Sequence, residues 1–407
     1  MKTFPYVIAG GGMVAGYAAK EMVERGLKAG ELCILSADRA LPYERPPLSK
    51  GFLAGKETED SIRINPPEFY ESHGIDVRLR TRISGLDAGR RTLRIESGNE
   101  LAFEKLILAT GSEIRTLEIP GSDLAGICYL RSVDDSERIR REAANAKQAA
   151  VIGGGFIGME TASVLAQQGV DVTMILREDR IWKQFFTPAM SEFFEGYYGA
   201  RGVRFVKEGK LSKVQGRGEV SGVALESGKT IPCTLVVAGI GVRPATDVFR
   251  HSGIDVGDGV TVDEYLETSH PDIYAAGDLA HYPDVLFGKR RRVEHWDNAV
   301  SQGQHCGRAL MGDRAAFRHV PYFFSDVFDL SYEFWGDTAE ADEIVERGDL
   351  STTSFSVWWL SNKRLVAAFT MNRPDEEREN APKWIEAGQK IDAQRLRGAG
   401  PLAEAAV

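Results

Sequence analysis

Short apolar runs alternate with amphipathic stretches over the first three fifths of this 407-residue chain. The runs at 33–35, 106–108, 172–175 and 235–237 consist mainly of Leu, Ile and Val, and segments of helical periodicity lie between them. Strands that alternate with helices are typical of parallel sheets joined by crossover helices. The pattern therefore predicts an α/β fold.

Two of the predicted strands lead into a glycine-rich turn and then a helix. The first turn contains Gly10, Gly12 and Ala15. The second contains Gly153, Gly155 and Gly158. This spacing gives a tight turn, a close approach of the backbone to a pyrophosphate, and close packing of helix on strand. One such fingerprint is weak evidence, but two with matching flanks predict two doubly wound domains that bind two dinucleotides.

An acidic residue follows each turn at the distance expected for a ribose contact. Asp38 lies after the strand that follows the first turn, and Glu178 lies 20 residues after Gly158. An acid at this place favours an unphosphorylated ribose, so the second site is predicted to bind NADH. Arg177 is suited to the extra phosphate of NADPH, which stays the alternative.

The sequence changes character after about residue 320. Aromatic and apolar residues alternate in the runs 355–360 and 365–369, which predicts antiparallel strands in a third, smaller domain. The last segment, from Leu396 to Val407, has no core pattern and is predicted to be a mobile tail.

Composition and charge narrow the class of ligand. A net charge of −9 disfavours general nucleic-acid binding. No run approaches the roughly 20 apolar residues that cross a bilayer, and no cleavable signal precedes the first strand, so a cytoplasmic location is the expectation. The cysteines form no CxxC pair and the histidines show no metal-binding spacing, so neither a dithiol centre nor a metal site is expected.

Further motifs resemble those of the FAD-dependent pyridine nucleotide reductases. This family comprises monodehydroascorbate reductases, oxygenase-coupled ferredoxin and rubredoxin reductases, and apoptosis-inducing factor. The matching segments are 43–50, 106–111 and 268–278. The resemblance implies a glutathione reductase-like arrangement with FAD at the first turn and NAD(P)H at the second. It also implies a discontinuous FAD domain of residues 1–115 and 245–320, an NAD(P)H domain of 116–244 and a C-terminal domain of 321–407.

The resemblance also assigns candidate site residues. Arg45 and Lys50 are expected to contact the flavin, and Glu160 is expected to pair with Lys50. We interpret this pair as tuning the reduced flavin, against the alternative of a surface charge and a helix acid. Asp278 is expected to bind the ribityl chain. The remaining positions expected at the cofactors are Ala109, Thr110, Gly111, Phe156, Ile157, Gly241, Gly277, Glu294, His295, Trp296 and Phe324.

The electron acceptor is the least determined part of the resemblance. Segments 321–325 and 328–337 are most similar to plant-type monodehydroascorbate reductases, but the Arg and Tyr that bind the ascorbyl radical there are replaced by Val300 and Phe324. Apolar side chains cannot supply the lost hydrogen bonds. Segment 293–303 is closer to the oxygenase-coupled ferredoxin reductases, which would place Trp296 near the flavin rather than only in a core.

Two readings of the basic run Lys289–Arg292 stay open. It is either a landing site for an acidic ferredoxin or a solvated hairpin tip. The predicted function is transfer of hydride from NADH to FAD and of electrons to a one-electron acceptor, with a ferredoxin-type protein favoured over a small radical such as monodehydroascorbate. The alternative of another class is a redox-responsive binding protein like apoptosis-inducing factor. The oligomeric state is not predicted.

Overall fold

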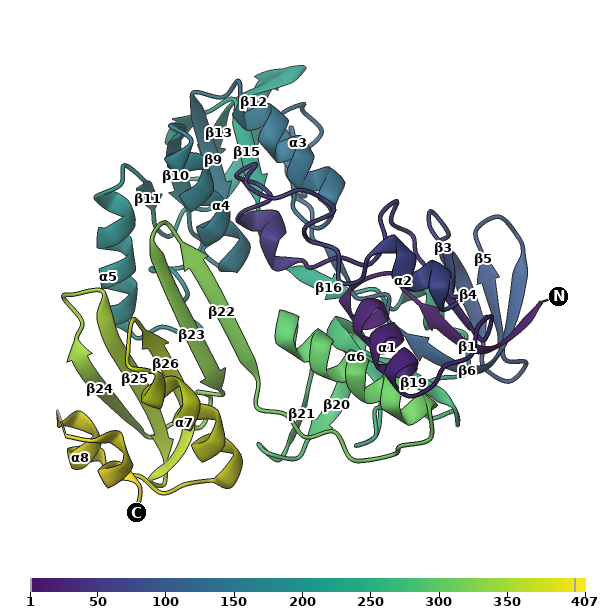
Figure 1. Ribbon diagram of the computed structural model, residues 1–407. Coiled ribbons are helices and arrows are strands. Elements are labelled where there is room, and N and C mark those ends of the chain that lie inside the picture. The colour runs from purple at the N-terminus through teal and green to yellow at the C-terminus, as the bar shows by residue number, and fades with distance from the viewer. Residues whose placement is uncertain (1, 399) are drawn as a thin grey trace. The chain divides into compact units, whose positions relative to one another are not determined.

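The computed structural model describes residues 2–398 and 400–407, and the chain divides into two compact units (Figure 1). The first unit consists of Met1–Arg45, Glu59–Glu113 and Val242–Pro321. The second unit consists of Pro46–Thr58, Ile114–Gly241 and Tyr322–Val407. The strands β7 (Ser112–Ile114) and β16 (Val242–Pro244) lie where the chain passes from one unit to the other.

The core of the first unit is a sheet with the order β3-β2-β1-β6-β5-β4, in which β19 also pairs with β6. The parallel strands are β1 (Thr3–Ala9), β2 (Leu32–Leu35), β3 (Asp76–Arg78), β6 (Glu100–Leu108) and β19 (Ile273–Ala275). The antiparallel edge consists of β4 (Ile83–Asp87) and β5 (Thr92–Ile95). The predicted strands at 33–35 and 106–108 lie in β2 and β6, which confirms them.

Two helices of the first unit, α1 (Met13–Glu24) and α6 (Trp296–Leu310), lie side by side in Figure 1. Glycines on α6 permit this contact, because a Cβ at Gly303 would lie 2.8 Å from the Val14 carbonyl oxygen. A Cβ at Gly307 would lie 2.9 Å from the Ala18 carbonyl oxygen. The smaller elements are α2 (Pro67–Ser72), β17 (Val256–Gly257), β18 (Gly259–Thr261), β20 (Ala280–Asp284), β21 (Lys289–Arg291), and the 3-10 turns Asp247–Phe249 and Gly277–Leu279.

The second unit contains another parallel sheet, of order β11-β10-β9-β15-β8. Its strands are β8 (Ile127–Cys128), β9 (Gln148–Ile152), β10 (Asp171–Ile175), β11 (Arg204–Val206) and β15 (Leu235–Ala238). Its helices are α3 (Val133–Ala143), α4 (Phe156–Gln167) and α5 (Pro188–Gly199). A three-stranded antiparallel sheet is formed by β12 (Leu211–Arg217), β13 (Glu219–Leu225) and β14 (Thr230–Pro232). The α/β prediction is confirmed.

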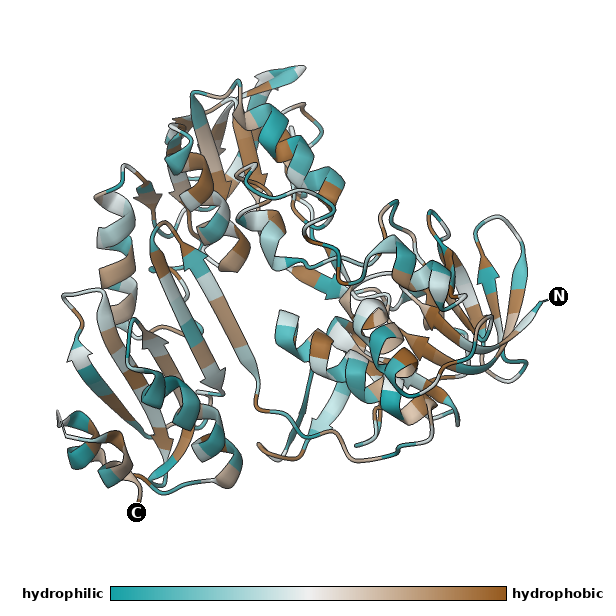
Figure 2. Cartoon of the chain, in the orientation of Figure 1, coloured by the Kyte–Doolittle hydropathy of each residue, from teal (hydrophilic) through white to brown (hydrophobic). Residues whose placement is uncertain are grey.

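A five-stranded antiparallel sheet completes the second unit, in the order β22-β23-β26-β25-β24. Its strands are β22 (Tyr322–Val327), β23 (Leu330–Gly336), β24 (Glu343–Asp349), β25 (Ser354–Ser361) and β26 (Arg364–Met371), followed by α7 (Asp375–Ala387) and α8 (Ala393–Arg397). Figure 2 shows hydrophobic residues concentrated on strands of the sheets. The predicted antiparallel strands at 355–360 and 365–369 lie in β25 and β26 and are confirmed.

Aromatic packing explains why this sheet belongs to the same unit as α5. On α5, Phe194 contacts Phe369 with ring centres 6.5 Å apart, and Phe193 contacts Phe355 at 5.3 Å. Residues 46–58 also belong to the second unit, although the sequence placed them within 1–115. Here the Ser136 hydroxyl donates a hydrogen bond of 2.7 Å to the Leu48 carbonyl oxygen, in the 3-10 turn Pro46–Ser49.

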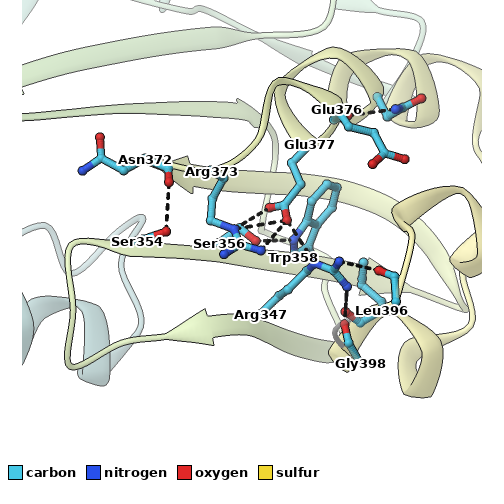
Figure 3. Close-up of polar contacts among 12 residues, drawn as sticks. Arg347, Ser354, Ser356, Trp358, Asn372, Arg373, Glu376, Glu377, Leu396 and Gly398 are labelled. Carbon is cyan, nitrogen blue, oxygen red and sulfur yellow. Dashed lines mark hydrogen bonds and ion pairs between the residues drawn. The ribbon is translucent and has the colours of Figure 1, made fainter.

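The C-terminal segment differs from the predicted mobile tail. It forms α8 and a 3-10 turn at Leu402–Ala405, and Leu396, Leu402 and Ala405 are fully buried. Arg347 donates hydrogen bonds to the carbonyl oxygens of Leu396 and Gly398 (Figure 3). The prediction was wrong because the three apolar residues follow no helical or strand period and the backbone is held by a side chain from β24.

Candidate cofactor and active site

The first glycine turn has the shape of a pyrophosphate cradle. Gly10 has φ +135°, and a Cβ there would lie 2.0 Å from the Ala109 carbonyl oxygen, so only glycine fits. Gly12 is the N-cap of α1, and no side chain caps this helix. Ala15 is fully buried where α1 packs on the sheet. The uncapped helix start therefore leaves backbone N–H groups for an anion.

The ends of three neighbouring parallel strands meet at this turn. Residues Ala109–Gly111 follow β6, and the N–H of Ala109 donates to the Ala9 carbonyl oxygen at the end of β1. Gly277 and Asp278 follow β19, and a Cβ at Gly277 would lie 2.8 Å from Val14 Cγ2. Ligands of doubly wound sheets bind at the carboxyl ends of the strands. The structure thus brings together three separate stretches of predicted FAD contacts.

Two further side chains are held near the first turn by hydrogen bonds. Asp38 follows β2, and its carboxylate accepts a 2.7 Å hydrogen bond from the Tyr43 hydroxyl. The Thr110 hydroxyl donates to the Ala245 carbonyl oxygen at 3.0 Å. Arg45 also lies at this turn, because a Cβ at Gly12 would lie 3.8 Å from its Nη2 atom. The Arg45 contact places the loop after β2 beside the start of α1, and the Thr110 hydrogen bond joins the segments that follow β6 and β16.

The start of α6 carries the predicted residues Glu294, His295 and Trp296. Burial lowers the pKa of His295 to about 4, so the ring is neutral near pH 7. The indole N–H of Trp296 donates a 2.5 Å hydrogen bond to Glu44. Glu44 also accepts from the Tyr17 hydroxyl at 2.5 Å. Glu44 and Tyr17 were not predicted from the sequence, although Glu44 lies inside the 43–50 motif.

The second glycine turn repeats the geometry of the first. Gly153 has φ +106°, and a Cβ there would lie 2.3 Å from the Gly239 carbonyl oxygen. Gly155 is the N-cap of α4 without a side-chain cap, and a Cβ at this position would have no atom within 4 Å. A Cβ at Gly158 would lie 2.1 Å from the Gly153 carbonyl oxygen. This turn also has room for a pyrophosphate at a helix start that no side chain caps.

The other predicted coenzyme positions lie in the second unit. Glu178 and Arg177 are exposed just after β10. Ile157 lies 3.5 Å from a Cβ built on Gly239, and Gly241 has φ +100° while its carbonyl oxygen accepts from Arg115 N–H. Phe156, the first residue of α4, contacts Phe323 of β22 with ring centres 4.7 Å apart.

Lys50 and Glu160 meet within the second unit. Lys50 Nζ lies 3.4 Å from Glu160 Oε1, 3.2 Å from Asp326 Oδ2 and 4.1 Å from the centre of the Phe324 ring. Glu160 is buried and also accepts hydrogen bonds from the hydroxyls of Ser49 and Ser325. Burial raises the pKa of Glu160, while Lys50 opposes that rise. Asp326 and both serines were not predicted from the sequence, although Ser49 lies inside the 43–50 motif and Ser325 inside the 321–325 segment.

The basic run Lys289–Arg292 is not a free cationic patch. Arg290 donates to the carbonyl oxygens of Val262 and His281 at 2.7 Å. Arg291 pairs with the buried Asp284, and Arg292 pairs with Asp258 and Glu294. Three of the four cations therefore have partners inside the first unit, and the run lies on β21 directly after the turn of the β20–β21 hairpin. A landing site for a ferredoxin at this run stays a prediction.

The remaining features to consider are the cysteines, metal-binding clusters and membrane-spanning helices. The four cysteines are buried and unpaired, and burial raises the pKa of Cys33 to about 12. Within residues 2–398 and 400–407 there is no group of three His, Cys, Asp or Glu side chains arranged to hold a metal ion. Over the same residues, no helix has the length and apolarity to cross a membrane.

A fold with two glycine turns, each at an uncapped helix start, defines a protein that binds two dinucleotides. The chain belongs to the pyridine nucleotide-disulphide oxidoreductase family, whose model matches residues 4–303, and residues 322–404 match the Reductase C-terminal family. The protein is an FAD-dependent NAD(P)H oxidoreductase. The predicted class of enzyme and its cofactors are thereby confirmed.

Three similar proteins show the range of the family. A peroxisomal monodehydroascorbate reductase 4 from Arabidopsis thaliana is 36% identical, over 98% of this chain and 86% of that protein. A rubredoxin-NAD(+) reductase from Pseudomonas putida is 36% identical, over 91% of this chain and 96% of that protein. The solved structure of a ferredoxin reductase from Rhodopseudomonas palustris has a TM-score of 0.94 and 30% identity, with both chains fully covered.

Proposed function

We propose that this protein takes hydride from NADH onto FAD and passes the electrons singly to an iron–sulfur protein of the ferredoxin type. The observation that carries the proposal is the pair of glycine turns with uncapped helix starts, one in each unit. When bound, FAD converts a two-electron hydride donor into a source of single electrons. The chain itself supplies binding, orientation and electrostatics.

We assign FAD to the first turn and the nicotinamide coenzyme to the second. The FAD domain would comprise residues 1–115, apart from the 46–58 segment that packs in the second unit, and residues 245–320. The coenzyme domain would comprise 116–244 and the C-terminal domain 321–407. The convergence of residues 109–111 and 277–278 on the first turn supports the first assignment. Exposed Glu178 after β10 supports NADH as the preferred coenzyme, because a carboxylate receives ribose hydroxyls and repels a 2′-phosphate.

We further propose that the Lys50 and Glu160 pair tunes the reduced flavin. Glu160 is a buried carboxylate with a raised pKa, and Lys50 is the ammonium group beside it. A change in the protonation of either group would change the charge at this point. No cysteine lies in the 43–50 segment, so the electrons are expected to leave the flavin without passing through a protein sulfur.

The acceptor is assigned from two kinds of support. Two of the similar proteins are named as a ferredoxin reductase and a rubredoxin-NAD(+) reductase. The apolar Val300 and Phe324 replace the cation and phenol that an anionic ascorbyl radical requires. The likeness to monodehydroascorbate reductases keeps that radical as the rival substrate.

Steady-state kinetics test the proposal directly. The purified holoprotein is given NADH with a [2Fe–2S] ferredoxin, a rubredoxin, or the ascorbyl radical generated by ascorbate oxidase. The proposal expects the highest kcat/KM with the ferredoxin. A higher value with the radical would overturn the acceptor assignment. Reduced flavin that persists in air for minutes with all three acceptors would favour a redox-responsive binding protein.

We propose a cytoplasmic location for this chemistry. Four buried, unpaired cysteines are suited to a reducing compartment. Fractionation of the source cells with an antibody to the protein tests this, and recovery with an organelle fraction would contradict it.

A further inference from the structure

We propose that Glu44 is a positioning residue that holds the Trp296 indole in the orientation needed for electrons to leave the flavin. The inference rests on the proposed function and on the expected position of Trp296 near the flavin. It adds Glu44, to which no role was assigned from the sequence, together with its partner Tyr17.

Glu44 is held by hydrogen bonds to other residues of the first unit. Its Oε2 atom accepts the indole N–H of Trp296 at 2.5 Å, and its Oε1 atom accepts the hydroxyl of Tyr17 at 2.5 Å. Its own backbone N–H donates to the Ile62 carbonyl oxygen at 2.8 Å. One carboxylate therefore connects the loop after β2, helix α1 and the first residue of α6.

The hydrogen-bonding chemistry of Glu44, Trp296 and Tyr17 fixes the orientation of the indole. An indole has one N–H donor, so an acceptor on that nitrogen fixes the rotation of the ring. Charge-assisted hydrogen bonds are roughly twice as strong as neutral ones. Burial raises the pKa of Tyr17, and the hydrogen bond to Glu44 raises it further, so the phenol stays a donor. Each oxygen of Glu44 therefore accepts a hydrogen bond, and the two bonds together hold the carboxylate in place beside Trp296.

A merely structural role for Glu44 is the main alternative. Helices α1 and α6 do not need this carboxylate to stay together, because they already approach closely at Gly303 and Gly307. A second acid also connects the same helices, since Glu21 on α1 lies 3.5 Å from Arg308 on α6. Glu21 lies near the end of α1, and its partner Arg308 lies at the opposite end of α6 from Trp296. Glu21 therefore provides a matched control.

The test separates hydride transfer from electron exit. Stopped-flow absorbance follows flavin reduction by NADH and then its reoxidation by a [2Fe–2S] ferredoxin, in wild type, Glu44→Gln, Glu44→Ala and Glu21→Gln. We expect Glu44→Ala to retain FAD, to be reduced by NADH within about twofold of wild type, and to be reoxidised about tenfold more slowly, the size expected for losing a charge-assisted hydrogen bond. Glu44→Gln keeps an acceptor oxygen for the indole and should recover most of the rate. Glu21→Gln should match wild type.

The background of Trp296→Phe shows whether Glu44 acts through the indole. If it does, adding Glu44→Ala to Trp296→Phe slows reoxidation no further. An undiminished effect of Glu44→Ala in that background, or an equal loss in Glu21→Gln, would overturn the inference. If wild type does not reduce the ferredoxin, the acceptor assignment fails, and the same variants are compared with ferricyanide or the ascorbyl radical, whichever wild type reduces fastest.

Discussion

The Nζ atom of Lys50 lies 3.4 Å from Oε1 of Glu160, a buried carboxylate on α4. The two residues come from different motifs, and their pairing connects the 43–50 loop to helix α4. Ion pairs of this kind cost desolvation energy on both partners and are seldom kept for stability alone. We therefore expect the Lys50–Glu160 pair to act through the charges that it places at this position.

Removal of one partner should cost more stability than neutralising the other. Lys50→Met leaves a buried carboxylate without its cation, and we expect the free energy of unfolding to fall by about 3–5 kcal/mol. Glu160→Gln keeps an amide that hydrogen-bonds Ser49 and Ser325, and about 1 kcal/mol is expected. Urea titrations followed by tryptophan fluorescence measure both. Asp326→Asn, at the exposed carboxylate on the same lysine, is the control and should lie within about 1 kcal/mol of wild type.

The buried ring of His295 predicts a loss of stability in acid. Its pKa is lowered from the usual 6.5 to about 4 in the folded protein, chiefly by burial, although Asp278 and Asp297 oppose the shift. Between these two values the unfolded chain binds the proton and the folded protein does not, so stability falls as the pH falls from 6.5 to 4. We expect this residue to account for about 1–3 kcal/mol of that fall. Unfolding titrations across this range should be flatter in His295→Gln, and parallel profiles would contradict the assignment.

The lack of space for a side chain at Gly10 tests the role of the first glycine turn in holding FAD. Gly10→Ala places a Cβ 2.0 Å from a backbone oxygen at a positive φ, so we expect a loss of about 3 kcal/mol and of FAD retention. Gly196→Ala is the matched control, because this glycine lies inside α5 with no atom within 4 Å of a new Cβ. It should keep FAD and gain up to about 1 kcal/mol from helix propensity. Flavin absorbance after gel filtration reports retention.

The sequence predicted the elements that depend on local spacing and missed those that depend on tertiary contacts. Both glycine turns, the strands at 33–35 and 235–237, and the antiparallel strands after residue 320 follow from periodicity and were found. Glu44, Asp326 and Ser325 acquire their partners only when distant segments meet, so no local pattern indicated their roles, even where a motif included the residue. The same reason explains the arginines of 289–292, whose acceptors come from strands and loops elsewhere in the first unit.

Coenzyme preference should depend on Glu178. We expect wild type to favour NADH over NADPH in kcat/KM for flavin reduction. Glu178→Gln removes a charged acceptor for ribose hydroxyls and should lower kcat/KM for NADH by about tenfold, which corresponds to about 1.4 kcal/mol. Since the repulsion of a 2′-phosphate is removed as well, activity with NADPH should rise. Equal use of both coenzymes by wild type would refute the role of Glu178, and Arg177→Gln then tests the neighbouring cation.

The C-terminal segment should depend on Arg347. This buried guanidinium donates to the carbonyl oxygen of Leu396 at 2.9 Å, and its Nε donates to Glu377 at 3.0 Å (Figure 3). It also donates to the carbonyl oxygen of Gly400 at 2.7 Å. Arg347→Met leaves these carbonyl groups without a donor and Glu377 with only Arg373, so we expect about 3–5 kcal/mol of destabilisation. Limited proteolysis should then cleave after Arg395 or Arg397, which wild type resists. Arg378→Met removes a more exposed ion pair with Glu333 and should leave the segment protected. Cleavage at equal rates in both variants would show that the buried Leu396 and Leu402 hold the segment without Arg347.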